Sequence, residues 1–349
     1  MSVFDHPEFA SHERVIQVAD RATNLRAIIA IHDRTLGPSV GGCRIYPYAS
    51  EQDALNDVLR LSKGMTYKTA LAGLPFGGAK SVIIANPSDK TPALIKAFGR
   101  AVNDLGGQYW TGEDVNFGAE DAETLAEVTP YVLGRTKGKV NTGDPSPFTA
   151  GGVFSAMKGA LKHVCGTDDI AGRRVAIQGL GNVGFNLAKL VTEGGGTVVA
   201  ADVLEESSKR AADELGATIV SPEAIYDEEC DVFAPCAMGA TVNDRTVPRL
   251  RASIVCGAAN NQLQSADVGR LLIQRRIAYV PDYVANAGGI LNAFGDFSGQ
   301  HDVSEVRRKI DAIGITVERI LEASKREHRP ANDIADEMAD AVLAGARGQ

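Results

Sequence analysis

The chain has 349 residues and a formal net charge of −8. This acidic balance, with no basic stripe or tail, argues against binding to nucleic acid. No apolar run approaches the ~20 residues that cross a bilayer, and the N-terminus lacks a signal-peptide pattern. The five cysteines are scattered without CxxC spacing, which is typical of reduced thiols. We therefore expect a cytoplasmic protein of about two domains that contacts no membrane.

The first part of the chain alternates helical and strand patterns, as in an α/β layer. Strands are predicted over the apolar run at 25–31 and over 81–85. Helices are predicted over about 50–64 and 91–105. The pattern changes at about residue 135.

Two lysines, Lys68 and Lys80, flank an apolar, glycine-rich turn in this part of the chain. Lys80 follows directly on Gly77-Gly78-Ala79, and glycines allow a ligand to approach the backbone closely. An ammonium group placed against backbone and apolar side chains loses hydration, so its pKa is expected to fall and it could act as a base near neutral pH. The alternative is a surface lysine beside a turn.

A segment rich in glycine, proline and serine, residues 138–152, predicts an interdomain hinge that closes around 143–147. From about residue 151, a helix leads into a second alternation of strands and helices, which indicates a doubly wound parallel sheet. Residues 303–349 have a helical, charged pattern. The expected fold class is therefore α/β, in two domains with a cleft between them.

The sequence RRVAIQGLGNVGFNLAKLV has the pattern of a dinucleotide-binding fingerprint. An apolar strand pattern leads into a GxGxxG turn, and an amphipathic helix pattern follows. The N-terminus of that helix would offer amides and a partial positive charge to a pyrophosphate. The predicted coenzyme-binding residues of the turn are Gly179, Gly181, Asn182, Val183 and Gly184.

Asp202 ends the next predicted strand, close to the ~20-residue offset expected for the acid that binds the ribose. Its carboxylate would accept hydrogen bonds from the ribose hydroxyls and repel a 2′-phosphate, and residues 203–206 contain no arginine to receive one. NAD is therefore expected rather than NADP. The six histidines are far apart in the sequence, so no metal site is predicted.

Nine segments occur in an order that resembles one known family. They are GPSVGGCR, GMTYK, GLPFGGAK, TGEDVN, GDPSPFTA, QGLGNVG, FAPCAMGATVND, GAANNQL and PDYVANAGGILN. Over about residues 12–320 the chain is similar to the glutamate/leucine/phenylalanine/valine dehydrogenases. The resemblance implies NAD-dependent, reversible oxidative deamination of an L-amino acid to a 2-oxo acid and ammonia, by a homo-oligomer. It implies a substrate-binding and oligomerisation domain at 1–135, onto which a C-terminal helix at about 330–349 is expected to pack, and an NAD-binding Rossmann domain at 136–329.

The resemblance also implies roles for individual residues. Lys80 would be the general base that activates water, Asp114 its acid/base partner, and Lys68 the group that binds the substrate α-carboxylate. The remaining implied positions are Gly41 and Gly42 against the substrate, and Thr149, Ala237, Asn260 and Asn261 around the coenzyme. The leucine and phenylalanine enzymes usually read GGGK where this chain has Ala79, but the glutamate enzymes tolerate alanine there.

The substrate side-chain pocket is expected at Val40, Gly112, Ile290 and Ala293, with Gly112 enlarging it. Glutamate-specific relatives carry a lysine at the position of Val40, so a glutamate side chain would be buried without a partner, which disfavours it. Several motifs are similar to those of leucine enzymes, so a leucine-type branched-chain substrate is expected. YWTG and CRxxPY resemble phenylalanine enzymes, which keeps phenylalanine dehydrogenase as the alternative. A non-catalytic NAD-binding regulator is the third hypothesis, although it would have no reason to hold two lysines and Asp114 together.

Overall fold

The computed structural model describes residues 2–135, 137 and 142–348. The chain divides into two compact units. The first unit comprises Met1–Asp144, Ala293–His301 and Asp340–Gln349, and the second comprises Pro145–Asn292 and Asp302–Ala339. The division therefore falls about ten residues after the expected boundary at 135, and two short C-terminal segments join the first unit.

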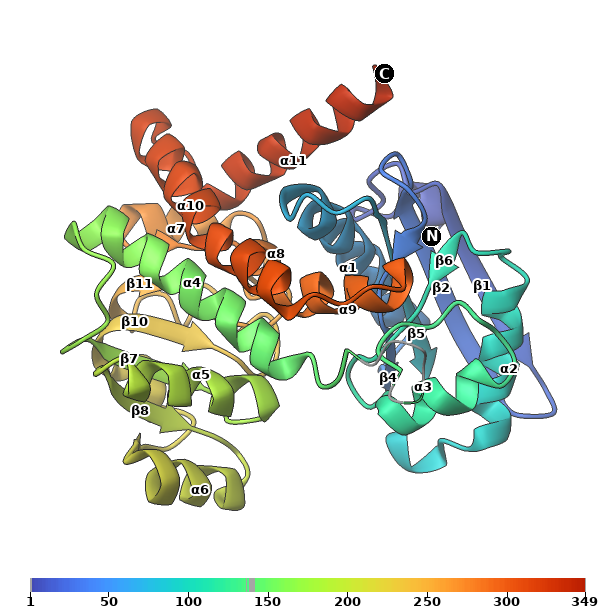
Figure 1. The fold of residues 1–349 in the computed structure, drawn as a ribbon, viewed down its shortest axis with the longest axis horizontal. Coiled ribbons are helices and arrows are strands. Elements are labelled where there is room, and N and C mark those ends of the chain that lie inside the picture. The colour runs from blue at the N-terminus through green and yellow to red at the C-terminus, as the bar shows by residue number, and fades with distance from the viewer. Residues whose placement is uncertain (1, 136, 138–141, 349) are drawn as a thin grey trace. The chain divides into compact units, whose positions relative to one another are not determined.

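The first unit contains a six-stranded mixed sheet and three helices (Figure 1). Its elements are β1 (Arg14–Asp20), β2 (Leu25–Asp33), β3 (Ser39–Val40), β4 (Cys43–Tyr46), α1 (Glu51–Leu71), β5 (Gly77–Ile84), α2 (Pro92–Asn103), β6 (Tyr109–Trp110) and α3 (Ala119–Ala126). The strand order is β1-β2-β5-β3-β6, and β4 also pairs with β5. Strand β5 thus lies in the middle of the sheet, with neighbours on both sides.

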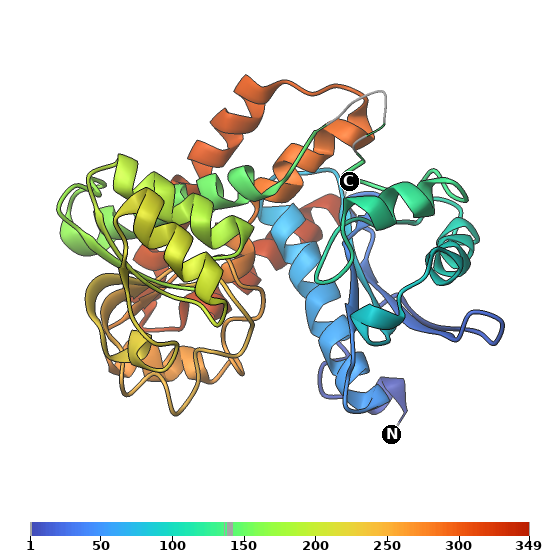
Figure 2. The same cartoon turned by 90° about the horizontal axis from the view of Figure 1, so that it is seen from below.

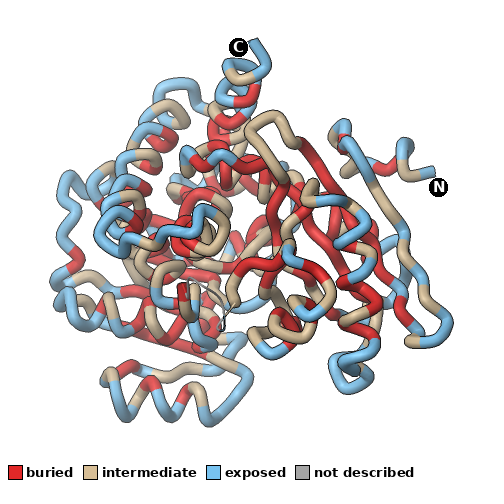
Figure 3. The backbone as a smooth tube through the Cα atoms, turned by 45° about the vertical axis from the view of Figure 1, so that its right-hand side comes forward, coloured by how far each residue is buried: buried red, intermediate tan, exposed pale blue. Residues whose placement is uncertain are grey.

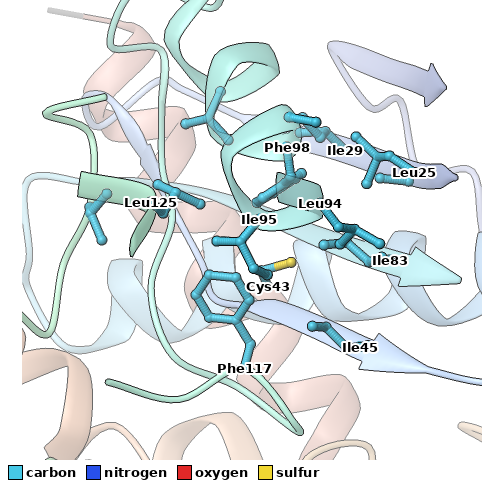
Figure 4. Packing of buried hydrophobic residues seen from close by; sticks show 14 of the residues in the cluster. Leu25, Ile29, Cys43, Ile45, Ile83, Leu94, Ile95, Phe98, Phe117 and Leu125 are labelled. Atoms are coloured by element: carbon cyan, nitrogen blue, oxygen red, sulfur yellow. The ribbon is translucent and has the colours of Figure 1, made fainter. Parts of the chain in front are cut away.

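Helices cover both faces of this sheet, because side chains alternate between the faces along each strand. Ile28 and Ala30 of β2 pack against α1, together with Val58 and Leu59. The side chains on the opposite face form a second core with α2 and α3, which includes Ile29, Cys43, Ile95, Phe98, Phe117 and Leu125 (Figure 4). In the cartoon of Figure 2, α1 lies on one side of this sheet and α2 and α3 lie on the other. Residues on β5 and β4 therefore face either α1 or α2, according to their position along the strand.

Helix α1 is longer than the sequence predicts. It begins after Ser50, whose hydroxyl accepts a hydrogen bond from the Asp53 amide, and it continues past Gly64 to Leu71. A glycine inside a helix costs only about 1 kcal/mol relative to alanine, and the buried face of α1 against the sheet outweighs that cost. The predicted helix end at about residue 64 is therefore wrong, and Lys68 lies in the last turn of α1. Strand β5 likewise begins at Gly77, so Lys80 lies within the strand.

The second unit has a six-stranded parallel sheet in the order β12-β11-β10-β7-β8-β9. Its elements are α4 (Ser146–Cys165), β7 (Arg174–Gln178), α5 (Asn182–Glu193), β8 (Thr197–Ala201), α6 (Glu205–Leu215), β9 (Thr218–Ile219), β10 (Glu229–Pro235), β11 (Arg251–Val255), α7 (Val268–Gln274), β12 (Ala278–Tyr279), α8 (Asp282–Ala285), α9 (Gly288–Ser298), α10 (Val303–Glu327) and α11 (Ala331–Arg347). Counted from β7, this is the 3-2-1-4-5-6 order of a doubly wound dinucleotide-binding sheet. The predicted fold class is confirmed.

Two C-terminal helices run from one unit into the other along the chain. Helix α9 enters the first unit at Ala293, and α11 enters it at Asp340. In the first unit, the Tyr67 hydroxyl donates a hydrogen bond to Asp340 Oδ1 at 2.8 Å, and Arg347 forms an ion pair with Asp33. The end of α11 is therefore held to the first unit by polar contacts.

The second half of the expected hinge, residues 146–152, is helical and not a loop. Helix α4 already begins at Ser146, five residues before the predicted start, and Pro147 is tolerated because the first helical turn needs no amide donor there. Residues 138–141 lie outside the described residues. Among the described residues, no helix is both long and apolar enough to cross a membrane. Most residues of β2 and β5 in the first unit, and of β7 and β8 in the second, are buried, whereas β1 has no buried residue; Figure 3 colours the chain by burial.

Candidate active site

The first unit places Lys80 against Asp114. Lys80 Nζ lies 2.5 Å from Asp114 Oδ2, and the two side chains are only 4% and 10% exposed. The second oxygen, Asp114 Oδ1, accepts a hydrogen bond from Arg44 Nε at 2.9 Å. One buried carboxylate thus lies between two cations that come from different strands.

The register of the sheet explains this convergence. Lys80 pairs with Ala30 across β2 and β5, and Arg44 pairs with Val82 across β4 and β5. Ala30 and Val82 belong to the core on the α1 side, and paired residues point to the same face of a sheet. Lys80 and Arg44 therefore both face α1, the helix that carries Lys68.

The two cations also set the ionisation of Asp114. Burial alone raises the pKa of this carboxyl, but the charges of Lys80 and Arg44 outweigh burial and hold it well below its usual range. Arg44 is itself held from its other side, because its Nη1 lies 2.8 Å from Asp57 Oδ2. The Tyr48 hydroxyl donates to the same Asp57 oxygen at 2.6 Å. The sequence analysis missed Arg44, Asp57 and Tyr48, although Arg44 lies in the GPSVGGCR segment.

Close backbone approaches surround the pair, which explains several glycines. A Cβ at Gly42 would lie 2.2 Å from the Glu113 carbonyl oxygen and 2.9 Å from Asp114 Cβ, and one at Gly41 would lie 1.8 Å from the Ala79 oxygen. A Cβ at Gly78 would lie 2.0 Å from the Thr66 amide of α1. A side chain at these positions would therefore push β5, which carries Lys80, away from α1 or from the loop at Gly41, or push that loop away from the one at Asp114.

Lys68 lies on the helix face that is turned towards these glycines. Met65 Cγ lies 3.3 Å from the position of a Cβ at Gly41, and residues three apart share one helix face. Lys68 follows Met65 by three residues and is half-buried. The structure thus brings Lys68, Gly41, Gly42, Lys80 and Asp114 together in the first unit.

The predicted pocket residues fall in both units. Val40 and Gly112 are buried in the first unit, Ala293 belongs to it as well, and Ile290 belongs to the second unit. A methyl group added at Gly112 would lie 3.2 Å from the Leu133 carbonyl oxygen, which is a tight contact on that side of the residue. Trp110, the strand neighbour of Val40, joins an aromatic cluster with Phe76, Tyr131, Phe294 and Phe297.

The second unit forms the predicted glycine turn between β7 and α5. Gly179 has a φ of +96°, which favours glycine, and a Cβ at Gly184 would lie 1.9 Å from the Gly179 oxygen. At Gly181, in contrast, a Cβ would meet no protein atom within 4 Å. Gly179 thus makes the turn, Gly184 lets the helix approach it, and Gly181 leaves open space at the N-terminus of α5. This arrangement fits a pyrophosphate, with Asn182 and Val183 in the first helical turn.

Asp202 follows β8 directly and is bonded to the same turn. Its Oδ2 accepts from the Leu180 amide at 2.6 Å, and its Oδ1 accepts from the Leu204 amide at 2.8 Å. The carboxylate is half-buried, and both of its oxygens keep lone pairs for further donors. Its position beside the glycine turn is the one that a ribose-binding acid needs.

Further candidate residues lie on the loops that follow β10 and β11. Asn261 has a φ of +51°, and its carbonyl oxygen accepts from the Ala240 amide at 2.7 Å, in the loop that also carries the exposed Ala237. Asn286, which the sequence analysis missed, donates from Nδ2 to Asn260 Oδ1 and to the Ala258 oxygen, each at 2.9 Å. Asn286 thereby fixes which way the Asn260 amide points. Thr149, in the first turn of α4, donates to the Pro145 oxygen at 3.0 Å.

Two histidines that are distant in sequence do meet. The rings of His12 and His32 contact each other edge to face, with centroids 4.8 Å apart, in the first unit. Their separation in the sequence therefore does not keep these two histidines apart in the fold. Among the residues the structure describes, no group of three or more histidine, cysteine or acidic side chains could hold a metal ion.

The chain combines a doubly wound sheet that has a coenzyme-type glycine turn with a buried lysine–carboxylate pair, and this combination fits a nicotinamide-dependent dehydrogenase. The family comparison specifies the class. The model of the Glu/Leu/Phe/Val dehydrogenase dimerisation domain matches residues 11–138, and the Glutamate/Leucine/Phenylalanine/Valine dehydrogenase model matches 144–205 and 201–329. The chain belongs to this family. It is an L-amino acid dehydrogenase that catalyses NAD-dependent oxidative deamination.

Similar proteins cover nearly the whole chain. Leucine dehydrogenase from Bacillus subtilis (strain 168) is 42% identical, over 97% of this chain and 93% of that protein. Valine dehydrogenase from Streptomyces virginiae is 41% identical, over 98% and 96%. The crystal structure of L-tryptophan dehydrogenase from Nostoc punctiforme has a TM-score of 0.80 and 40% identity, over 96% of this chain and 97% of that one. Relatives that are almost equally similar to this chain are thus named for different amino acids.

Proposed function

We propose that the substrate is an apolar L-amino acid of the leucine type, and that Lys68, Lys80 and Asp114 carry its chemistry. The buried pair of Lys80 and Asp114, facing the helix that bears Lys68, is the observation that supports this assignment. Bound NAD would accept a hydride from the substrate Cα, which leaves an iminium carbon that water must attack. The protein then has to hold the α-carboxylate, activate the water and move protons.

Each of these tasks suits a residue of the first unit. Lys68 offers a positive charge to the α-carboxylate. Lys80, when unprotonated, takes a proton from the attacking water, and Asp114 exchanges protons between the amine and the water. Gly41 and Gly42 let the backbone pack closely around this group of residues, because neither position can hold a side chain.

The apolar character of the pocket rests on Val40. Its side chain is completely buried, in register with Trp110 of the aromatic cluster. A substrate carboxylate beside Val40 would lose hydration without gaining a cation, which disfavours glutamate. The names of two relatives, leucine and valine dehydrogenase, agree with a branched aliphatic substrate.

An aromatic substrate is the second candidate. The relative named L-tryptophan dehydrogenase is 41% identical over 97% of this chain, so a closely related sequence is associated with a large aromatic substrate. Phe294 contacts Phe76 and Phe297, with centroids 5.5 and 6.3 Å away, which reduces the volume near Ala293. That contact favours the smaller, leucine-type side chain over phenylalanine.

We further propose that the protein is a homo-oligomer that assembles through its first unit, which matches a dimerisation-domain model. For the coenzyme, Asp202 supports NAD over NADP, as the carboxylate beside the glycine turn would repel a 2′-phosphate.

Initial rates with leucine, valine, phenylalanine, tryptophan and glutamate, each with NAD and NADP, test the substrate and the coenzyme together. We expect the highest kcat/KM for leucine with NAD. The variant Val40→Lys should lower kcat/KM for leucine and admit some glutamate. Faster turnover of phenylalanine or tryptophan than of leucine would overturn the leucine-type assignment and favour the aromatic alternative.

A further inference from the structure

We propose that Arg44 is a positioning residue, which keeps the Asp114 carboxylate turned towards Lys80, and ionised whenever Asp114 does not itself hold the transferred proton. The inference rests on the proposed role of Lys80 as the base. It extends that role, because neither the sequence motifs nor the family resemblance assigns a task to Arg44, Asp57 or Tyr48.

The argument begins with the two oxygens of Asp114, which have different partners. Oδ2 faces Lys80 Nζ at 2.5 Å, and Oδ1 faces Arg44 Nε at 2.9 Å. A base must cycle between a charged and a neutral amine, so the attraction between Lys80 and Asp114 weakens in each turnover. Arg44 stays charged throughout, because burial beside Asp114 and Asp57 does not deprotonate a guanidinium. It is the cation that remains when Lys80 is neutral.

Arg44 is itself held in a fixed direction. Its side chain is 14% exposed, with Nε on Asp114 and Nη1 on Asp57. Asp57, on α1, also accepts the hydrogen bond of the Tyr48 hydroxyl. Burial raises the pKa of Tyr48 well above its usual range, so the hydroxyl keeps its proton and donates. The chain of contacts from Tyr48 to Lys80 therefore alternates donors and acceptors without a gap.

Other titratable groups near Asp114 add no charge that could replace Arg44. Cys43 of β4 and Tyr109 of β6 are completely buried, and burial raises the pKa of Cys43 to about 12 and that of Tyr109 further. Both stay neutral at working pH. Lys68 lies on α1, and its charge is assigned to the substrate carboxylate. Arg44 and Lys80 thus both form ion pairs with Asp114, and Arg44 is the one of the two that stays charged.

The pH dependence of kcat/KM tests the proposal. In Arg44→Gln, loss of a positive charge beside Asp114 favours the ammonium form of Lys80, so the acid limb should move to higher pH by about one unit. The maximal kcat should fall about tenfold. Arg44→Lys keeps the charge but loses the two-sided geometry, so its acid limb should stay near that of the wild type while kcat falls.

Two further variants separate positioning from folding. Lys90→Gln breaks another partly buried ion pair of the first unit, that of Lys90 Nζ and Asp121 Oδ2 at 2.6 Å, and should leave the pH profile unchanged. Asp57→Asn removes a negative charge beyond Arg44, so its acid limb should move slightly to lower pH, and this variant decides the matter if Arg44→Gln does not fold. An unshifted acid limb in folded Arg44→Gln, or in Asp57→Asn, overturns the proposal. Full activity of Lys80→Ala would instead overturn the base assignment itself.

Discussion

The candidate ligand sites of the two units are formed by different kinds of groups. In the first unit the site consists of charged side chains that neutralise one another in a buried setting, with Asp114 between Lys80 and Arg44. In the second unit it consists mainly of backbone, with a glycine turn, a helix N-terminus and loop amides. A site made of charges responds to pH and to the loss of any partner, whereas a site made of backbone responds to added atoms. Substitutions in the two units should therefore impair the protein in different ways.

The largest effect is expected from Lys80→Ala. Loss of a positioned general base lowers kcat by about 10²-fold or more. NAD affinity should change little, because the glycine turn belongs to the other unit. Steady-state kinetics combined with NAD titration by fluorescence would measure both quantities. The control is Lys90→Ala, which removes another ion-paired lysine of the first unit and should keep kcat. Near-wild-type kcat in Lys80→Ala, at its own pH optimum, would make Lys80 a structural residue.

Adding one methyl group at two positions of the glycine turn should give opposite results. In Gly184→Ala the new Cβ would lie 1.9 Å from the Gly179 oxygen, so the second unit should lose about 1–3 kcal/mol of stability. In Gly181→Ala the Cβ meets no protein atom within 4 Å, so the stability of the free protein should hold. The methyl would then occupy the space proposed for the pyrophosphate, and the Kd for NAD should rise about tenfold. Thermal unfolding with and without NAD measures both, and unaltered NAD binding by Gly181→Ala would contradict the placement of the pyrophosphate.

Asp202→Ala should change coenzyme choice rather than catalysis. Without the carboxylate, the ratio of kcat/KM for NAD to that for NADP should fall about tenfold, because both the ribose hydrogen bonds and the repulsion of a 2′-phosphate are lost. The Leu180 and Leu204 amides lose their acceptor as well, so Asp202→Asn, which keeps an oxygen for one amide, is the matched variant. Both variants should shift the ratio in the same direction. An unchanged ratio would remove Asp202 from the ribose site.

The difference between the units also explains what the sequence could predict. The glycine turn is contiguous, and its strand and helix are its direct neighbours, so local pattern was sufficient to find it. Lys80, Arg44, Asp57 and Asp114 come from β5, β4, α1 and the loop after β6, and only sheet register brings them together. The resemblance to a family indicated Lys80 and Asp114. Arg44 lies in a family motif that was given no role, and Asp57 lies in none of the motifs.

Two local errors have a similar origin. Gly64 and the glycines before Lys80 suggested a helix end and a turn, but packing of α1 on the sheet overrides the local preference of glycine. The pair of His12 and His32 was missed because 20 residues and a complete strand separate them in the chain. Both features, the end of α1 and the histidine pair, depend on tertiary packing, which local sequence patterns do not reveal.

That histidine pair should make the first unit the more acid-sensitive one, a second consequence of burying ionisable groups there. Burial lowers the pKa of both histidines from 6.5 to about 4, and their mutual repulsion contributes for His12. The Ala10 amide donates to His12 Nδ1 at 3.2 Å, which requires the neutral ring. In the unfolded chain the two histidines would bind protons below pH 6.5, but in the folded protein they bind them only near pH 4. The stability that comes from keeping both rings neutral is therefore fully present above pH 6.5 and is lost as the pH falls towards 4. The loss is about 1 kcal/mol per pH unit for each histidine.

Hydrogen exchange at pH 7 and pH 5, read separately for the peptides of each unit, measures this loss. Protection of β2 and α1 should fall more between the two pH values than protection of β7 and β8, after correction for intrinsic exchange rates. In His12→Gln a side-chain amide can still accept from the Ala10 amide and donate towards the Leu59 oxygen, but it does not titrate. This variant should therefore lose less protection at pH 5 than the wild type does. Equal losses in the two units, or an unchanged loss in His12→Gln, would show that the pair does not govern the acid response and that the carboxylates around Asp114 are the next groups to test.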